Sequence, residues 1–202
     1  DRSKGGSVHA LEPMRNIAPG RLAIADTPEP VMVYRDDGQV SFDRTKSAQL
    51  VAVVFPIPFP ETSRAAALAS DAGELNAIVS VGLESILASH AVLAAQYRAA
   101  GVLTIVALHG TMRGASFGCR VAPLSDVAVP VAEHWGAFDI QLAGHIHQRQ
   151  RAPGTLLPGY VGAPDRMDFG EADDVPGVVI FDGGVETHLP NPQPRVYKTI
   201  EL

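Results

Sequence analysis

Two apolar runs in the second half of the chain have the length of single strands. They cover residues 102–108 (VLTIVAL) and 138–143 (FDIQLA), and they stop at His109 and at Gly144. A continuous apolar run of this length is typical of a strand that is covered on both faces of a sheet. We therefore predict two strands with both faces buried.

A helical pattern precedes these two runs. Between residues 73 and 100, apolar residues recur at spacings of three and four, which predicts one amphipathic helix. Gly101 suits the position after its last turn. Shorter helical pieces are predicted over residues 62–69 and 7–14.

Short β-like runs account for most of the remaining chain. The segment Asp36-Asp37-Gly38 predicts a hairpin turn. Pro56 predicts the end of the preceding strand at Phe55, because proline cannot donate to a strand ladder. Strands, then a helix, then further strands indicate a layered α/β fold, and we expect one domain over residues 1–202. The further predicted strands are residues 21–25, 31–34, 39–42, 50–55, 158–161, 178–181 and 196–200.

Composition and charge narrow the function classes. The chain has 202 residues, of which 46% are hydrophobic, so a sizeable core is expected. A net charge of −6 argues against coating nucleic acid by bulk charge, because that requires clustered Lys and Arg. The single cysteine, Cys119, excludes an intrachain disulfide and favours a cytoplasmic location. We expect no signal peptide and no apolar run of membrane-spanning length.

Three histidines directly follow the two buried runs. His109 ends the first, and His145 and His147 follow Gly144 at the end of the second. In an extended segment His145 and His147 would face the same side, with Ile146 turned toward the core. A single histidine after a strand is usually a surface or core residue, but this combination favours a metal site, since imidazoles suit Zn, Mn, Fe or Ni. We expect the three rings to face one pocket.

These residues resemble two motifs of the calcineurin-like metallophosphoesterases. Residues 107–110 (ALHG) resemble the single histidine that follows one strand there, and residues 143–147 (AGHIH) resemble the later Gly-His-x-His. Residues 160–171 (YVGAPDRMDFGE) are similar to the "Y-x-G-S-x-x-R-x-x-F-x-E" segment of SbcD-type DNA repair exonucleases, and residues 176–180 to the strand after it. The resemblance is good from about residue 50 onward and loose before it.

The resemblance implies a layered α/β–β/α metallophosphoesterase sandwich with two divalent metal ions. His109 and His145 would bind one ion and His147 the other, with Mn as the first choice and Zn, Fe or Mg as alternatives. Arg149 and Arg166 are the candidate substrate-binding residues. Residues 159–171 are expected to form a wall of the site.

The earlier motifs of that family, D-x-H, G-D-x-x-D and G-N-H-[DE], do not occur in the 202 residues. In the family they supply aspartates, an asparagine and a further histidine to the metals, together with the histidine that protonates the leaving group. We therefore expect this chain to be an incomplete, C-terminal portion of its domain. It would contain no catalytic acid or base and be inactive alone, while its parent protein would be active.

Three functions remain open. The first is a DNA exonuclease or endonuclease, whose expected partners are DNA, an SbcC-type ATPase and a second copy of the chain, without a membrane. The second is a phosphoesterase acting on nucleotides or phosphomonoesters, and the third is a non-catalytic interaction domain. The segment from Arg166 to Glu171 favours the nuclease. Those two residues have an alternative, structural role, in which they pair to hold the wall.

Overall fold

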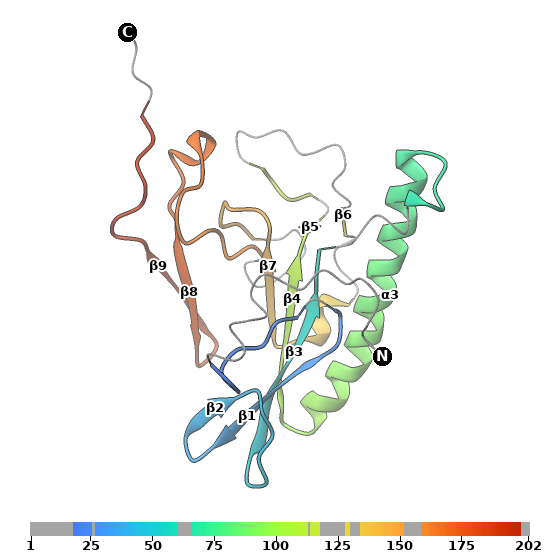
Figure 1. The fold of residues 1–202 in the computed structure, drawn as a ribbon, viewed down its shortest axis with the longest axis vertical. Coiled ribbons are helices and arrows are strands. Elements are labelled where there is room, and N and C mark those ends of the chain that lie inside the picture. Colours follow the sequence, from blue (N-terminus) through green and yellow to red (C-terminus); the bar gives the residue numbers. More distant parts are fainter. Residues whose placement is uncertain are drawn as a thin grey trace.

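The computed structural model describes residues 18–25, 27–59, 66–112, 114–117, 128–129, 134–151 and 159–198, and these form a mixed α/β domain (Figure 1). A five-stranded sheet has the order β2-β1-β3-β4-β7, and β5–β6 and β8–β9 form two-stranded sheets. The elements are β1 Val31–Asp36, β2 Gln39–Ser41, β3 Gln49–Ile57, α3 Ala72–Ala99, β4 Leu103–His109, β5 Thr111–Met112, β6 Ala128–Val129, the 3-10 helix η1 Trp135–Ala137, β7 Ile140–Gly144, the 3-10 helix η2 Phe169–Glu171, β8 Gly177–Asp182 and β9 Val185–Pro190.

The two predicted apolar strands are neighbours in the main sheet. They correspond to β4 and β7, which pair in parallel from Ile105 opposite Ile140 to His109 opposite Gly144. β3 also runs parallel to β4, whereas β1 pairs antiparallel with β2 and β3. Because β3, β4 and β7 are parallel, their carboxyl ends lie at one edge of the sheet.

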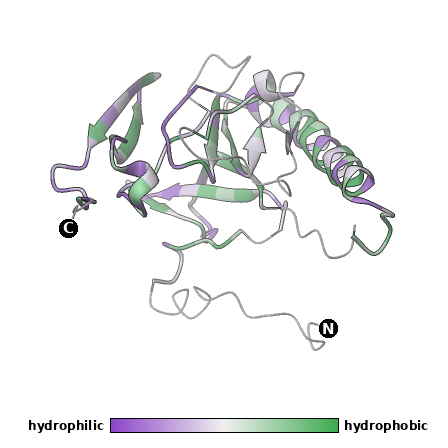
Figure 2. Ribbon diagram, turned by 90° about the horizontal axis from the view of Figure 1, so that it is seen from above, coloured by the Kyte–Doolittle hydropathy of each residue, from purple (hydrophilic) through white to green (hydrophobic). Residues whose placement is uncertain are grey.

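Only one face of β4 is fully buried, so the prediction of two covered faces is wrong for this strand. Thr104, Val106 and Leu108 are buried, while Ile105 and Ala107 between them remain partly accessible. Val106 lies opposite Phe55 of β3, and both belong to the core cluster that includes the buried face of α3. The helix therefore covers one side of the sheet, and Figure 2 shows it lying along that side, away from the β8–β9 hairpin.

Helix α3 is continuous from Ala72 to Ala99, close to the predicted bounds. Its N-cap is Asp71, whose side chain accepts a hydrogen bond from Glu74 N at 2.9 Å. The Glu74 carboxylate accepts in return from the backbone N–H of Ser70 at 2.7 Å, so two donors at the start of the helix are satisfied. Gly101 has φ +74°, as expected for the residue that ends a helix.

The composition of α3 contradicts the expectation that no apolar run reaches membrane-spanning length. Within the described ranges, this one helix is long and apolar enough to cross a bilayer, with 22% of its most apolar window buried. Core helices of soluble domains meet the same criterion. Val79, Leu83, Leu87, His90 and Ala94 are buried in α3, and four of these five belong to the hydrophobic core cluster.

Strand β3 continues through Pro56 to Ile57, so the prediction that proline ends it at Phe55 is wrong. β3 pairs with β1 only as far as Val54, and beyond that residue it pairs with β4 alone. Proline is compatible with such a segment, because a strand edge without a partner needs no backbone donor.

The β8–β9 hairpin contains a strand that the sequence pattern missed. β8 was predicted over 178–181, but β9 was not, although Asp182-Gly183-Gly184 between them is a hairpin signal. Gly183 and Gly184 have φ +54° and +82° in this turn. No strand occurs over residues 21–25 or 196–198 within the described ranges, so these two predictions are wrong there. The predicted helix over 7–14 and the first half of that over 62–69 lie outside the described residues, and residues 67–69 are not helical.

Candidate metal centre

His109 and His145 lie side by side where β4 and β7 end. His109 is the last residue of β4 and its register partner is Gly144, the last residue of β7. A Cβ atom at Gly144 would lie 3.3 Å from His109 Nδ1, so glycine there lets β7 pass close to the imidazole. The ring centroids of His109 and His145 are 5.4 Å apart at an interplanar angle of 71°.

The backbone turns sharply at His145 itself. His145 has φ +93°, which side-chain-bearing residues rarely adopt. Gly144 itself remains in the strand, and the positive φ falls on the residue after it. A strained backbone at a candidate ligand is typical of functional sites, where the surrounding structure holds the residue in place.

Burial favours the neutral form of the His109 side chain. The pKa of His109 is lowered from its ordinary value, first because the ring is buried and then because His145 and His147 would repel its positive charge. His145 and His147 therefore both lie within electrostatic reach of His109. Neutral imidazole is the form that binds a metal ion.

His147 is held by a buried carboxylate. Its Nδ1 lies 2.6 Å from Glu171 Oε1, and Glu171 is only 3% exposed. The side chain of His147 itself is 37% exposed. Ile146 is buried between the two histidines, as predicted. The three histidines are therefore divided into a pair, His109 with His145, and a third residue with its own partner.

The segment of residues 159–171 packs against the Gly-His-Ile-His turn, as predicted for a wall of the site. Tyr160 forms isolated bridges to Ala143 and to Gln150. Ala163 N donates to the carbonyl oxygen of His147 at 2.9 Å. The Tyr160 hydroxyl donates to Gly110 O at 2.9 Å and accepts from a backbone N–H of β5 at 2.7 Å, which ties this wall to the segment after β4.

The two candidate substrate-binding arginines have partners within the protein. Arg149 forms an ion pair with Glu186 of β9. Arg166 donates from Nε and Nη2 to Asp174 O and from Nη1 to Arg195 O, so it fastens the C-terminal segment to the wall. The proposed Arg166–Glu171 pair is wrong, because the guanidinium contacts main-chain carbonyls while Glu171 contacts His147. Substrate binding by either arginine stays a prediction.

Phe59 is a residue of this site that the sequence analysis missed. It lies two residues after β3, and its ring centroid is 5.4 Å from that of His145 and 6.1 Å from that of His109. Phe59 is 49% exposed, so an apolar ring stands beside the histidine pair and faces solvent. An aromatic residue after the strand next to β4 was the available signal, because the ends of parallel neighbours meet at one edge.

The residues present fit part of a two-metal centre. Among the described residues, no group of three or more His, Cys, Asp or Glu side chains is arranged to hold one metal ion. His109 and His145 nevertheless offer two adjacent imidazoles, and His147 offers a third whose other nitrogen is already fixed by Glu171. Imidazoles in such a group suit Mn, Fe or Zn, and further ligands would complete each coordination sphere.

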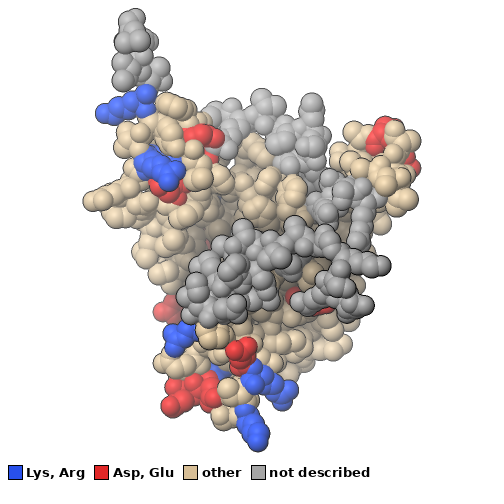
Figure 3. All heavy atoms as spheres, viewed as in Figure 1, with Lys and Arg blue, Asp and Glu red and all other residues tan. Residues whose placement is uncertain are grey.

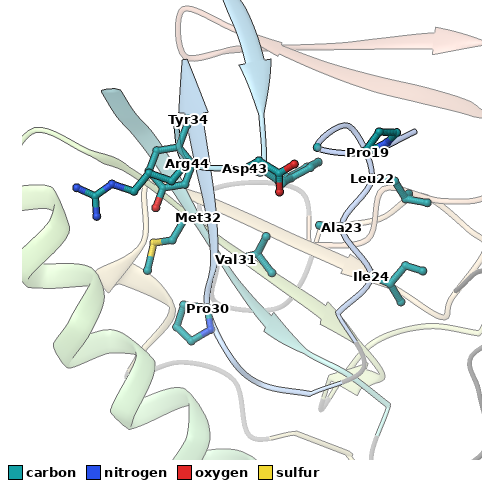
Figure 4. A pocket seen from close by; sticks show the side chains of 12 residues that line it. Pro19, Leu22, Ala23, Ile24, Pro30, Val31, Met32, Tyr34, Asp43 and Arg44 are labelled. Carbon is teal, nitrogen blue, oxygen red and sulfur yellow. The ribbon is translucent and has the colours of Figure 1, made fainter. Parts of the chain in front are cut away.

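Two of the pockets in the described parts of the molecule differ in their relation to the histidines. One of about 270 Å³ opens beside His147 and is also lined by Arg149, Asp173, Asp174 and His188. The two aspartates would repel a phosphate unless cations were bound nearby. The other, of about 590 Å³, is formed between residues 19–24 and β1, and Figure 4 shows its largely apolar lining with Asp43 and Arg44 beside it. None of the three histidines lines the larger pocket.

The described residues on the face drawn in Figure 3 do not form a basic field. Lys and Arg side chains lie interspersed with Asp and Glu, chiefly around the β1–β2 end. This agrees with the net charge of −6. A scan against models of known protein families found no match, and no curated protein matches the chain.

Proposed function

We propose that this chain carries the histidine side of a two-metal phosphodiesterase centre. The observation that carries the proposal is the placement of the three histidines after two neighbouring parallel strands, with His109 and His145 in ring contact. His109 and His145 would hold one divalent cation and His147 a second. Mn is the first choice, since it accepts both imidazole and carboxylate ligands.

The fold that accompanies this proposal is the α/β–β/α sandwich of the metallophosphoesterases. The main sheet has one face closed by α3, whereas Ile105 and Ala107 on the other face remain partly accessible. A sheet with one fully buried and one half-buried face suits an architecture in which a second layer covers the latter.

The chemistry of such a centre is phosphodiester hydrolysis. When bound, two divalent cations about 3.5–4 Å apart clamp the phosphodiester and neutralise the charge that develops as it is attacked. The residues of this chain would supply neutral imidazoles and hold them in place. Burial favours the neutral ring of His109, and residues 159–171 contact His147 at its backbone and at its ring.

The preferred substrate is DNA, as in the SbcD-type nucleases that residues 160–171 resemble. The contacts of that segment support its role as a wall, because Glu171 and Ala163 both bind His147. For a substrate with many phosphates, the bound cations would supply most of the positive charge, since the chain has a net charge of −6.

A nuclease assay tests this function. Linear duplex DNA with added Mn²⁺ is incubated with the 202-residue chain, with the protein as it is encoded in its genome, and with a His147→Ala variant of the encoded protein. We expect cleavage by the encoded protein and loss of most of it in the variant. The 202-residue chain alone should hold at most one metal ion and cleave nothing, because two cations at close range repel each other without a bridging carboxylate.

Controls separate the alternatives. Hydrolysis of bis-p-nitrophenyl phosphate and p-nitrophenyl phosphate without cleavage of DNA would favour the nucleotide or phosphomonoester phosphoesterase. Robust DNA cleavage by the 202-residue chain would overturn the assignment of the missing ligands. Full activity of the His147→Ala variant would overturn the metal role of that histidine.

A further inference from the structure

The carboxylate of Glu171 is held at both of its oxygens. Oε1 lies 2.6 Å from His147 Nδ1, and Oε2 accepts from Met167 N at 2.6 Å. Asp168 begins the 3-10 helix η2 by accepting a hydrogen bond from Gly170 N, and this turn brings Glu171 to the inside. A buried charge is costly unless it is fully paired, so this arrangement places the carboxylate specifically beside the imidazole.

We propose that Glu171 is a positioning residue that keeps the proton of His147 on Nδ1 and leaves Nε2 free to bind a divalent cation. The inference rests on the proposed function, because it concerns the same histidine. With Glu171 ionised, its carboxylate can only accept hydrogen bonds, so the nitrogen that faces Oε1 carries a hydrogen. The lone pair of a neutral His147 then resides on Nε2, the nitrogen that a metal ion requires.

The main chain restricts His147 in the same orientation. Ala163 N donates to its carbonyl oxygen at 2.9 Å, and a Cβ atom at Gly162 would lie 3.0 Å from that oxygen. The wall therefore contacts His147 at its backbone and at its ring. A carboxylate behind a metal-binding histidine fixes both ring orientation and tautomer, and its loss typically lowers metal affinity about 10–100-fold.

The substitution Glu171→Gln discriminates positioning from a mere loop contact. Glutamine has nearly the same shape but only one oxygen, and the backbone N–H of Met167 needs that oxygen as acceptor. The amide NH₂ must then face His147 Nδ1, where it donates. The imidazole would move its proton to Nε2, which removes the lone pair that a cation needs.

Two measurements detect this movement of the His147 proton from Nδ1 to Nε2. Long-range ¹H–¹⁵N NMR of the metal-free 202-residue chain at mildly alkaline pH reports which ring nitrogen of His147 is protonated. We expect Nδ1 in the unmodified chain and Nε2 in Glu171→Gln. Calorimetric titration of the encoded protein with Mn²⁺ alone should show an affinity about 10–100-fold lower in Glu171→Gln.

The matched control is Glu84→Gln, an exposed helix residue whose substitution changes the net charge equally. It should leave the tautomer and the affinity unchanged. Backbone amide spectra show whether residues 159–171 keep their structure in each variant. If Glu171→Gln fails to fold, the tautomer of the unmodified chain still decides, because a proton on Nε2 there overturns the inference.

Failure of the inference and failure of the proposed function give different results. If Mn²⁺ binding is lost in His147→Ala but both tautomer and affinity are unchanged in Glu171→Gln, the positioning role is wrong and the metal centre stands. If the tautomer switches as expected but no Mn²⁺ binding depends on His147, the contact is as we infer and the metal centre is wrong.

Discussion

Two phenylalanines near the end of β3 differ sharply in their surroundings. Phe55, on the helix-facing side of the sheet, is fully buried and its ring meets Phe138 at 5.4 Å. Phe59, at the edge with the histidines, is 49% exposed and stands beside His145. Apolar burial therefore places residues on the helix-facing side, whereas at the histidine edge a strained backbone and polar contacts place them. Regions of the second kind are typical of binding sites.

The largest expected effect tests this contrast directly. Phe55→Ala should lower the free energy of unfolding by about 3–5 kcal/mol, because it leaves a cavity in a packed core. Phe59→Ala should lower it by less than about 1 kcal/mol, since the ring is half exposed. Urea unfolding followed by circular dichroism measures both. Equal losses in the two variants would contradict the distinction between core and edge.

The hydroxyl of Tyr160 connects the two regions and should have the next largest effect. Tyr160→Phe removes a buried group that bonds Gly110 O and Met112 N, so we expect a loss of about 1–3 kcal/mol in unfolding free energy. Tyr97→Phe is the matched control, and it should change stability by less than about 0.5 kcal/mol. Indistinguishable thermal unfolding of the two variants would show that Tyr160 does not fasten the wall.

Because the backbone of His145 is strained, Gly and Ala substitutions there should rank in stability in the opposite order from the same two substitutions at His109. At His145, with φ +93°, the Gly variant should be more stable than the Ala variant by about 1–2 kcal/mol. At His109, within β4, the Ala variant should be more stable than the Gly variant by about 0.5–1 kcal/mol. Both comparisons remove an imidazole, so the difference isolates the backbone. The same sign at both sites would contradict strain at His145.

The smallest expected effect is a pH dependence of the unfolding free energy, and it arises from His90 on the helix-facing side of the sheet. Burial lowers the pKa of His90 from its ordinary value of 6.5, although the Pro28 carbonyl oxygen, 2.7 Å from Nε2, partly opposes this. The unfolded chain therefore binds more protons than the folded one just below that value. The stability that neutral His90 contributes to the fold is fully present above the pKa of the unfolded chain. It is lost as the pH falls through 6.5 toward the lower pKa of the folded state.

His90→Leu should flatten this pH dependence. Urea unfolding of the unmodified chain and of the variant, compared between neutral and mildly acidic pH, isolates the contribution of this side chain from that of other titrating groups. Parallel pH profiles for the two proteins would contradict a buried, neutral His90.

Local patterns predicted the elements that frame the candidate site. The apolar runs correspond to β4 and β7, the spacing of three and four corresponds to α3, and Gly101 ends that helix as expected. β9 was missed although the Gly183-Gly184 turn signal lies in the sequence. The continuation of β3 through Pro56 was not predictable from the sequence pattern, because it depends on which strand edges have partners. Pairing between distant segments is not visible in a local window.

The sequence by itself determined that His109, His145 and His147 follow two strands, since apolar periodicity and strand length are local properties. Only the tertiary structure decided that β4 and β7 are parallel neighbours, which brings His109 to His145. It also decided that Glu171 contacts His147 and not Arg166. The physical reason is that a buried carboxylate must pair with the hydrogen-bond donors that lie next to it. Which donors lie there depends on how residues 159–171 pack against the rest of the fold.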